Sequence, residues 1–541
     1  MDSTMATRRI RRSVKGAALL ALFALVLAAC GSSSSSPSAA GSSSASTGSS
    51  SAAGSSPASS SALGGTLTVG LGSLPLSQGN PFGATYAGPA VEAWAAIYDA
   101  LTNTSPAGAT PALATSWKLV DPTTWQFTLR QGVTFSDGEA FNASAAAFTF
   151  NYLASPAGAK TAMGGSFQQI AGAKVVSPYV LDITTKGPDP ILPRQVVQAN
   201  IVAPKAWQSE GPKGFATHPV GTGPYEVTSW GATTVDLTRF AGSWRPGHYK
   251  SLTLVEIPNN ASRFQALQSG QIQVDYNLTR QEVTQTKAAS NLTLLHEPAG
   301  QVYALQYLNV AGSPLLNQDV REALDVAINR QANVSAVLGN LAQPAYQGAS
   351  PGDSGYDSSL GPIPYNPSQA KSLLAKGGYP NGFSFKVAVP EPTFFGVSSI
   401  SQLAASDLAK VGVHMTLVPV PFASWLTDFL SGHFPGDQAA GISYSDAPSF
   451  DAALTLDRGS CLEKPSVVWC QQAQAAVLAK INTTTNLTTR QQLFDQVDTM
   501  ERANPPALFL FDMVNVTGVS SKVKATYEPI GTIDFSSAAP A

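Results

Sequence analysis

The folded body of the chain is predicted to begin near residue 65, where apolar and polar residues start to alternate. Residues 66–70 (Thr-Leu-Thr-Val-Gly) show this alternation, and residues 125–130 (Trp-Gln-Phe-Thr-Leu-Arg) repeat it. Such alternation is typical of strands with one buried face. Asp137-Gly138 then indicates a hairpin turn, so we expect β-structure early in the body.

Apolar residues spaced three and four positions apart predict helices between the strands. One such segment runs from Ala90 to Leu101, and Asn142 is a suitable N-cap for a second helix over 143–153. The same spacing in residues 320–328 predicts a third helix with one side on a core. The pattern as a whole favours a mixed α/β protein.

The first 29 residues have the order of charge and apolar residues that is found in an export signal. Five Lys and Arg residues between Arg8 and Lys15 precede an apolar run from Ala17 to Ala29. That run is shorter than the roughly twenty apolar residues that a membrane-spanning helix needs. We therefore expect residues 1–29 to be a signal peptide that directs the chain out of the cytoplasm.

The end of this segment, Leu27-Ala28-Ala29-Cys30-Gly31, resembles the bacterial lipobox. The resemblance implies that Cys30 is diacylated and becomes the mature N-terminus, which anchors the protein at the extracytoplasmic face of the cell membrane. The alternative is an ordinary cleaved signal with an incidental cysteine. Residues 31–64 contain eighteen Ser among thirty-four positions and no charged or aromatic residue, so residues 30–64 are expected to form a flexible tether.

Composition limits the classes of function. The 541 residues carry a net charge of -2, and without residues 1–29 they hold 27 Lys and Arg against 33 Asp and Glu. This mildly acidic balance argues against nucleic acid as a partner.

Roughly 477 residues follow the tether, and one hydrophobic core stops growing at about 250 to 300 residues. Two or three lobes with a ligand cleft between them are therefore expected.

The remaining candidate chemistry points away from metal sites and catalysis. Cys461 and Cys470 are an even pair in an exported chain, which favours a disulfide over a metal pair. The five His residues are isolated, so no metal and no cofactor are expected. Residues 348–352 match the Gly-x-Ser-x-Gly elbow of hydrolases, but Pro351 lacks the backbone N–H that an oxyanion needs.

Collinear blocks along the body resemble those of the bacterial extracellular solute-binding proteins of family 5, which bind oligopeptides, dipeptides and nickel. Ser136 departs from the family's usual His, while the other blocks follow the family's order. The blocks are 111–117, 127–130, 132–138, 219–225, 269–275, 319–324, 327–330, 365–374 and 408–413.

The resemblance implies an α/β, periplasmic-binding-protein-like fold of class II, cluster C, with three lobes and a hinged ligand cleft. It further implies a monomer. The expected lobes are residues 65–105, 219–300 and 506–541 for lobe I, 106–218 for lobe II, and 301–505 for lobe III.

The same resemblance suggests candidate ligand-binding residues. In the dipeptide-binding branch an Asp pairs with the free amine of the peptide, and Asp446 matches it in the stretch 445–451. Asp446 can instead start a turn before a proline, and Ser449 replaces a second Asp of the family pattern. Tyr444 and Trp425 are candidates for the pocket wall or for the core, and Arg458 for a carboxylate partner or a surface residue.

We therefore expect a receptor without enzymatic activity, which captures a small solute, of the peptide class, and presents it to a membrane permease. No Gly-x-x-x-x-Gly-Lys phosphate loop is present in the sequence, so the ATPase of this ABC importer is expected to be a separate chain. The competing hypothesis is a lipoprotein of the same fold that acts as a cell-surface sensor or interaction protein. An exported hydrolase ranks third.

Overall fold

The computed structural model describes residues 63–541 except 87, 392–394, 432, 446, 463–467 and 529–530. Its described part contains a mixed ten-stranded sheet. Asp446 and Cys30, predicted as ligand-binding and lipid-bearing residues, lie outside the described residues. The strands of the sheet follow the order β14 (Val413–Pro421), β13 (Phe383–Glu391), β15 (Ala439–Ser445), β12 (Leu292–Tyr307), β16 (Ala507–Ser520), β11 (Val274–Tyr276), β1 (Gly64–Leu71), β10 (Tyr249–Glu256), β9 (Thr234–Arg239) and β8 (Tyr225–Trp230).

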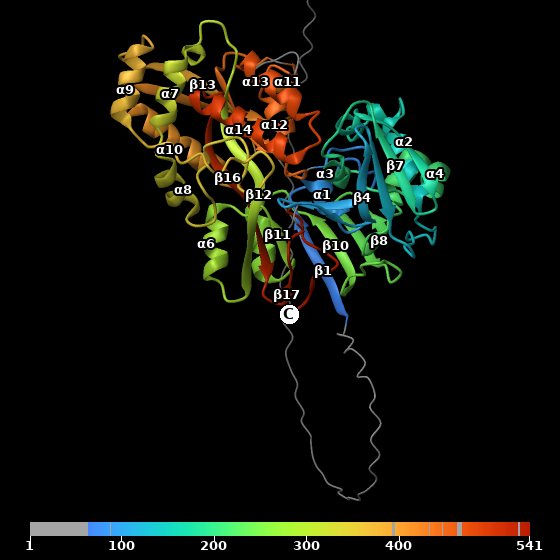
Figure 1. The fold of residues 1–541 in the computed structure, drawn as a ribbon. Coiled ribbons are helices and arrows are strands. Elements are labelled where there is room, and N and C mark those ends of the chain that lie inside the picture. The colour runs from blue at the N-terminus through green and yellow to red at the C-terminus, as the bar shows by residue number, and fades with distance from the viewer. Residues whose placement is uncertain are drawn as a thin grey trace, which may run out of the picture. The chain divides into compact units, whose positions relative to one another are not determined.

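Two long antiparallel strands, β12 and β16, join the two halves of this sheet (Figure 1). β12 runs through the predicted boundary between residues 300 and 301, and its register with β16 shifts between Pro298 and Val302. Gly300 lies within that shift with a φ of 60°, a conformation that side-chain-bearing residues rarely adopt. Strands from the ranges predicted as lobes I and III therefore form one sheet with an irregularity at its centre.

A separate four-stranded antiparallel sheet forms in residues 114–185. Its strands are ordered β4 (Ala114–Asp121), β5 (Thr124–Leu129), β7 (Val180–Thr185) and β6 (Ile170–Ser177). Helix α2 (Ala143–Ala154) packs on β6 and β7. Asn142 Oδ1 accepts hydrogen bonds from the backbone N–H groups of Ser144 and Ala145, at 2.8 and 3.2 Å. The predicted N-cap is confirmed, and the helix begins where the sequence indicates.

The remaining helices and two short strand pairs complete the fold. Among the described residues no helix is both long and apolar enough to cross a membrane. The strand pairs are β2 (Thr102–Ser105) with β3 (Gly108–Pro111) and β17 (Val523–Lys524) with β18 (Ala539–Pro540); the helices are α1 (Pro89–Trp94), α3 (Leu192–Gln195), α4 (Pro204–Thr217), α5 (Asn260–Ser269), α6 (Arg280–Ala288), α7 (Gln318–Val326), α8 (Arg330–Leu338), α9 (Pro367–Lys376), α10 (Val397–Ala409), α11 (Phe422–Ser431), α12 (Ala453–Arg458), α13 (Gln472–Ile481) and α14 (Leu487–Ala503).

The prediction of a helix over Ala90–Leu101 is wrong in length, because α1 ends at Trp94. Beyond that point the backbone carbonyls bond to distant residues. Ile97 O accepts from Gly223 N at 2.9 Å, and Ala96 O accepts from Tyr225 N at 3.0 Å. Tertiary partners thus replace the helical bonds.

The glycine at position 221 permits the close approach of these two segments. A Cβ atom there would lie 2.0 Å from the carbonyl oxygen of Ile97. Gly221 therefore belongs to the packing surface for the segment that follows α1.

Candidate ligand site

The loop from residue 446 to residue 451 connects β15 to α12 and is fixed from two directions. Its Ala447 N–H donates to Gly300 O at 3.0 Å, which ties the loop to the irregularity in β12. On its other side, Ser354 N–H donates to Phe450 O at 3.0 Å. The neighbours of Asp446 are thus placed at the centre of the large sheet, although Asp446 itself lies outside the described residues.

Gly300 accommodates the aromatic ring of this loop. A Cβ atom on Gly300 would lie 2.8 Å from Cε1 of Phe450. Phe450 is buried and has a φ of 51°, so its backbone conformation is itself unfavourable for a side-chain-bearing residue. Gly300 is therefore required twice, for its own positive φ and for the space that the Phe450 ring occupies.

A buried ion pair supports the base of the loop. Arg490 of α14 donates from Nη2 to Asp451 Oδ1 at 2.8 Å and from Nη1 to Asp451 Oδ2. Both residues are almost fully buried, at 0% exposure for Asp451 and 1% for Arg490. Arg490 Nε also donates to Ile481 O at 3.1 Å. These bonds satisfy the buried charges, which would be costly if unpaired.

Residues from a distant part of the chain reach the same loop. Arg194 Nη1 donates to Phe450 O at 2.9 Å and to Ser449 O at 3.2 Å. Thr104 Oγ1 donates to Pro448 O at 2.5 Å. Arg194 belongs to the range predicted as lobe II, and the loop to the range predicted as lobe III.

The position of Arg194 follows from local structure. Asp189 Oδ1 accepts from Ile191 N–H at 3.0 Å just before the single-turn helix α3, and Trp125 of β5 donates from Nε1 to Asp189 O at 2.8 Å. These bonds connect α3 to the four-stranded sheet. Burial lowers the pKa of Arg194 and raises the pKa of Asp189 to about 6.

Asp512 of β16 lies against the loop that contains Ser350 and Asp353. Asp512 is 9% exposed, and its Oδ1 has no hydrogen-bond partner among the described residues. Burial raises the pKa of Asp512 to about 8, a hydrogen bond with Ser350 opposes that rise, and the negative charge of Asp353 adds to it. The site therefore combines donors from Arg194 with a surplus of buried carboxylate.

The structure places the other predicted site residues in different surroundings. Tyr444 is 1% exposed and donates its hydroxyl to Gln306, with its ring packed edge-on against Phe509. Trp425 is 7% exposed and stacks on Phe429 at a centroid distance of 5.3 Å. Both belong to one hydrophobic cluster of the core. Contacts of these two residues with ligand stay predictions.

Arg458 is exposed at the end of α12, and its role as a carboxylate partner also stays a prediction.

Cys461 and Cys470 form a disulfide with a Cα–Cα distance of 5.5 Å. Next to it, the ring of Trp469 lies under the Arg321 guanidinium, 3.5 Å from the ring centroid. The disulfide loop is thus attached to α7.

Sequence reasoning did not identify Arg194, Arg490 or Asp512. No motif surrounds any of them, because each gains its role from a partner far away in the sequence. Residues 348–352, considered for an esterase-like elbow, form a loop without the helix that such an elbow requires. That loop instead leads to Asp353 and Ser354, beside the candidate site.

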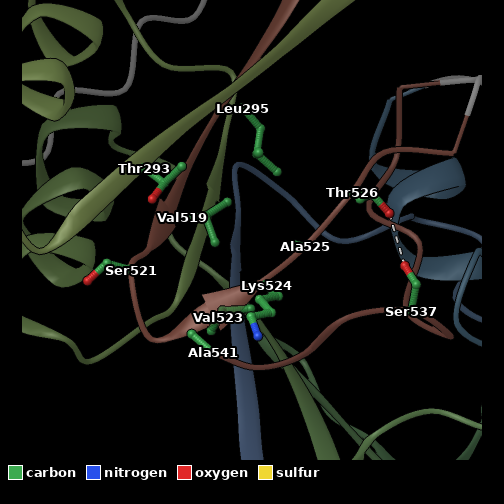
Figure 2. Close-up of a pocket in the computed structure, with 10 residues that line it drawn as sticks. All are labelled: Thr293, Leu295, Val519, Ser521, Val523, Lys524, Ala525, Thr526, Ser537 and Ala541. Atoms are coloured by element: carbon green, nitrogen blue, oxygen red, sulfur yellow. Dashed lines mark hydrogen bonds between the residues drawn. The ribbon is translucent and has the colours of Figure 1, made fainter.

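Two cavities lie elsewhere, and none of the predicted site residues lines them. Figure 2 shows one of about 450 Å³ near β17, where Lys524 is the one charged side chain among ten lining residues and Thr526 and Ser537 share a 3.0 Å hydrogen bond. A second, of about 250 Å³, is lined by Tyr86, Arg245 and others. In the described part of the chain, no group of three or more His, Cys, Asp or Glu could hold a metal ion.

A mixed α/β body with two strands shared between its halves defines the periplasmic-binding-protein-like class, and comparison with known proteins gives the family. The model for bacterial extracellular solute-binding proteins, family 5 Middle, matches residues 108–458. The chain belongs to this family, as the resemblance predicted.

Relatives and solved structures agree with this assignment. The glutathione-binding protein GsiB of Salmonella typhimurium is 33% identical over 298 residues, which cover 54% of this chain and 57% of that protein. The match thus spans little more than half the length of this curated relative.

The fold is similar over 88% of the chain to two solved structures, each covered completely. HbpA2 from Haemophilus parasuis has a TM-score of 0.74 at 22% identity. A dipeptide-binding protein from Pseudoalteromonas sp. SM9913, in complex with Met-Leu, has a TM-score of 0.72 at 22% identity.

Proposed function

We propose that this protein is the extracytoplasmic receptor of an ABC importer, and that it captures a small solute of the short-peptide class for a separate permease and ATPase. Family membership supports solute binding. A glutathione-binding relative and a structural neighbour with bound Met-Leu support peptides as the class. The lobe boundaries given above are part of this proposal.

One observation carries the proposal furthest: the loop 446–451 is contacted by both of the segments that a closing receptor would bring together. Gly300 of the large sheet and Ser354 of the loop at residues 348–354 bond to the loop 446–451, and Arg194 bonds to it from the side of the four-stranded sheet. A ligand held at this loop would touch both sides only in the closed form. It would therefore shift the population toward closure by its differential affinity.

The membrane attachment in this proposal rests on the sequence. Cys30 after Leu27-Ala28-Ala29 is the lipid-bearing residue, and residues 30–64 connect it to the body as a flexible tether. A coil of this length has a root-mean-square reach of roughly 30 Å, which lets a tethered receptor approach a permease in the same membrane.

A thermal-shift screen tests the class of solute. Short peptides, glutathione, sugars and nickel chelates would each be added to the purified chain, because a ligand at 100 times its dissociation constant stabilises by about 2.7 kcal/mol. Stabilisation by peptides that is weakened in Asp446→Ala supports the proposal. Stabilisation by another class alone contradicts the peptide assignment, and the absence of any hit favours the sensor or interaction protein.

A further inference from the structure

Several buried aspartates pair with an arginine in the described part of the chain, and Asp512 does not. Asp99 contacts Arg245, Asp275 contacts Arg263, Asp325 contacts Arg330 and Asp451 contacts Arg490. Asp512 forms no ion pair among the described residues, and its Oδ1 has no hydrogen-bond partner there. A buried carboxylate without a cation is unfavourable unless it is protonated or receives a cation from elsewhere.

The backbone holds Asp512 firmly in place. Its N–H donates to Gln343 O at 2.9 Å, and the residue pairs with Val302 of β12. Val302 is the first residue of β12 paired with β16 after the register shift that contains Gly300. The carboxyl group is therefore fixed beside the point where the loop 446–451 is attached.

Negative charge also accumulates on the facing loop. Asp353 is 5% exposed and raises the pKa of Asp512 by its charge, while the Ser350 hydroxyl lies within hydrogen-bonding reach of the same carboxyl group. Asp357 and Asp512 both act electrostatically on Tyr356 in this region. Among the described residues no Lys or Arg forms an ion pair with Asp512, and the negative charge of Asp353 makes a cation beside Asp512 more favourable.

The same loop forms part of the junction between the two sheets. A Cβ atom on Gly352 would lie 3.3 Å from Pro106, which is in the range predicted as lobe II, and Ser354 bonds to Phe450. Another buried acidic pair, Asp498 and Glu501, lies within α14, where Gln474 donates to Glu501 at 2.5 Å. That pair lies on a helix and has a side-chain partner in Gln474, so its setting differs from that of Asp512 on the central strand β16.

We propose that Asp512 is a ligand-contacting residue that pairs with a positively charged group of the solute, an ammonium or a guanidinium. This inference rests on the proposed function and specifies the solute as one that carries a cation. Closure around the ligand would exclude water, and a charge-assisted hydrogen bond is strong under that condition. Asp512 would then recognise the positive charge of the solute, while backbone groups of the protein bind the rest of the solute.

Matched ligands test this directly on the purified full-length chain. Short peptides that differ by one charge would be compared by calorimetric titration: lysine against norleucine, arginine against citrulline, and a free against an acetylated amino terminus. The variant Asp512→Asn keeps the size of the side chain and removes its charge. Asp121→Asn, at the exposed end of β4, serves as the control.

The wild-type chain is expected to prefer the charged member of at least one pair by about 10- to 100-fold, as expected for a hydrogen bond to a charged group. Asp512→Asn should remove that preference and leave the affinity for the uncharged member unchanged or higher. Asp121→Asn should retain the preference.

Four results would overturn the inference. A wild-type chain that binds both members equally, or a variant that keeps the preference, removes the role of Asp512 while the proposed function stands. An equal loss of both members in Asp512→Asn indicates a purely structural residue, and a melting temperature near the wild-type value would show that the variant is folded. If no peptide binds the wild-type chain, the proposed function fails and the inference fails with it.

Discussion

Arg194 Nη1 donates a hydrogen bond to the carbonyl oxygen of Phe450 at 2.9 Å, and these two residues are 256 positions apart in the sequence. The donor is held by the four-stranded sheet, and the acceptor belongs to the loop that follows β15. A second bond from the same nitrogen reaches Ser449 O at 3.2 Å. This contact joins two parts of the protein at residues 449 and 450.

Removal of this contact is expected to speed the release of ligand. Arg194→Gln loses the guanidinium that bonds to both carbonyls, and hydrogen bonds to charged groups contribute about 1.5–3 kcal/mol. We predict that the ligand dissociation rate rises roughly tenfold, measured by stopped-flow displacement. Arg280→Gln is the matched control, because the exposed Arg280 also donates to a backbone carbonyl, that of Ala336. Equal rates in both variants would argue against a role for Arg194 in closure.

The Asp451–Arg490 pair is expected to dominate the stability of the loop. Asp451→Asn leaves the Arg490 guanidinium buried without a counter-charge, which costs about 3–5 kcal/mol. Urea denaturation should show this loss. The control Asp319→Asn alters a pair in which Lys376 is 70% exposed, and it should cost less than about 1 kcal/mol. Similar losses in the two variants would contradict the account of the buried pair.

Gly300 is expected to tolerate no side chain. Gly300→Ala places a Cβ atom 2.8 Å from Phe450 and forces a residue with a side chain to a φ of 60°. Gly270→Ala is a control for the backbone term alone, since Gly270 has a φ of 79° and open space around its Cβ position. The control should lose about 1–2 kcal/mol. Gly300→Ala should lose more and also bind ligand more weakly, and a loss no larger than the control's would exclude the steric role.

The pH dependence of stability should reveal Asp512. Its folded pKa of about 8 lies above the usual value of 3.8 because of burial. A raised pKa means that the folded state keeps the proton of Asp512 to a higher pH than the unfolded state does. The contribution of Asp512 to the free energy of unfolding is therefore fully present below pH 4 and is lost as the pH rises to about 8. Asp512→Asn should therefore gain stability relative to wild type between pH 5 and pH 9.

The expected gain is on the order of a few kcal/mol, at about 1.4 kcal/mol for each pKa unit. Glu501, whose pKa burial raises to about 8, titrates in the same window. Because Glu501 is present in both proteins, the difference between variant and wild type isolates Asp512. A difference in unfolding free energy that does not change with pH would contradict the raised pKa.

Local signals in the sequence predicted individual elements but not their assembly. The strand at residues 66–70 and the N-cap at Asn142 were predictable because each depends on neighbouring residues. The helix from Ala90 was predicted too long, because carbonyls after Trp94 bond to residues more than a hundred positions away. The order of strands in the large sheet depends on such distant pairings, so only the family resemblance indicated the architecture.

The candidate site was predictable to a smaller extent. The stretch around Asp446 was identified by resemblance, and the structure places its neighbours where β12, β15 and the loop at Ser354 meet. Arg194 stands in the sequence Leu-Pro-Arg-Gln, which carries no recognisable pattern. Asp512 lies in an apolar strand, where a single acidic residue indicates burial without revealing its partner.

A crystal structure of the complex with the best-binding peptide would test the central claim most directly. We predict that the peptide lies at the loop 446–451, enclosed from both sides, with a positively charged group within hydrogen-bonding distance of Asp512. A peptide bound elsewhere, such as in the cavity near β17 shown in Figure 2, would contradict the assignment of the site.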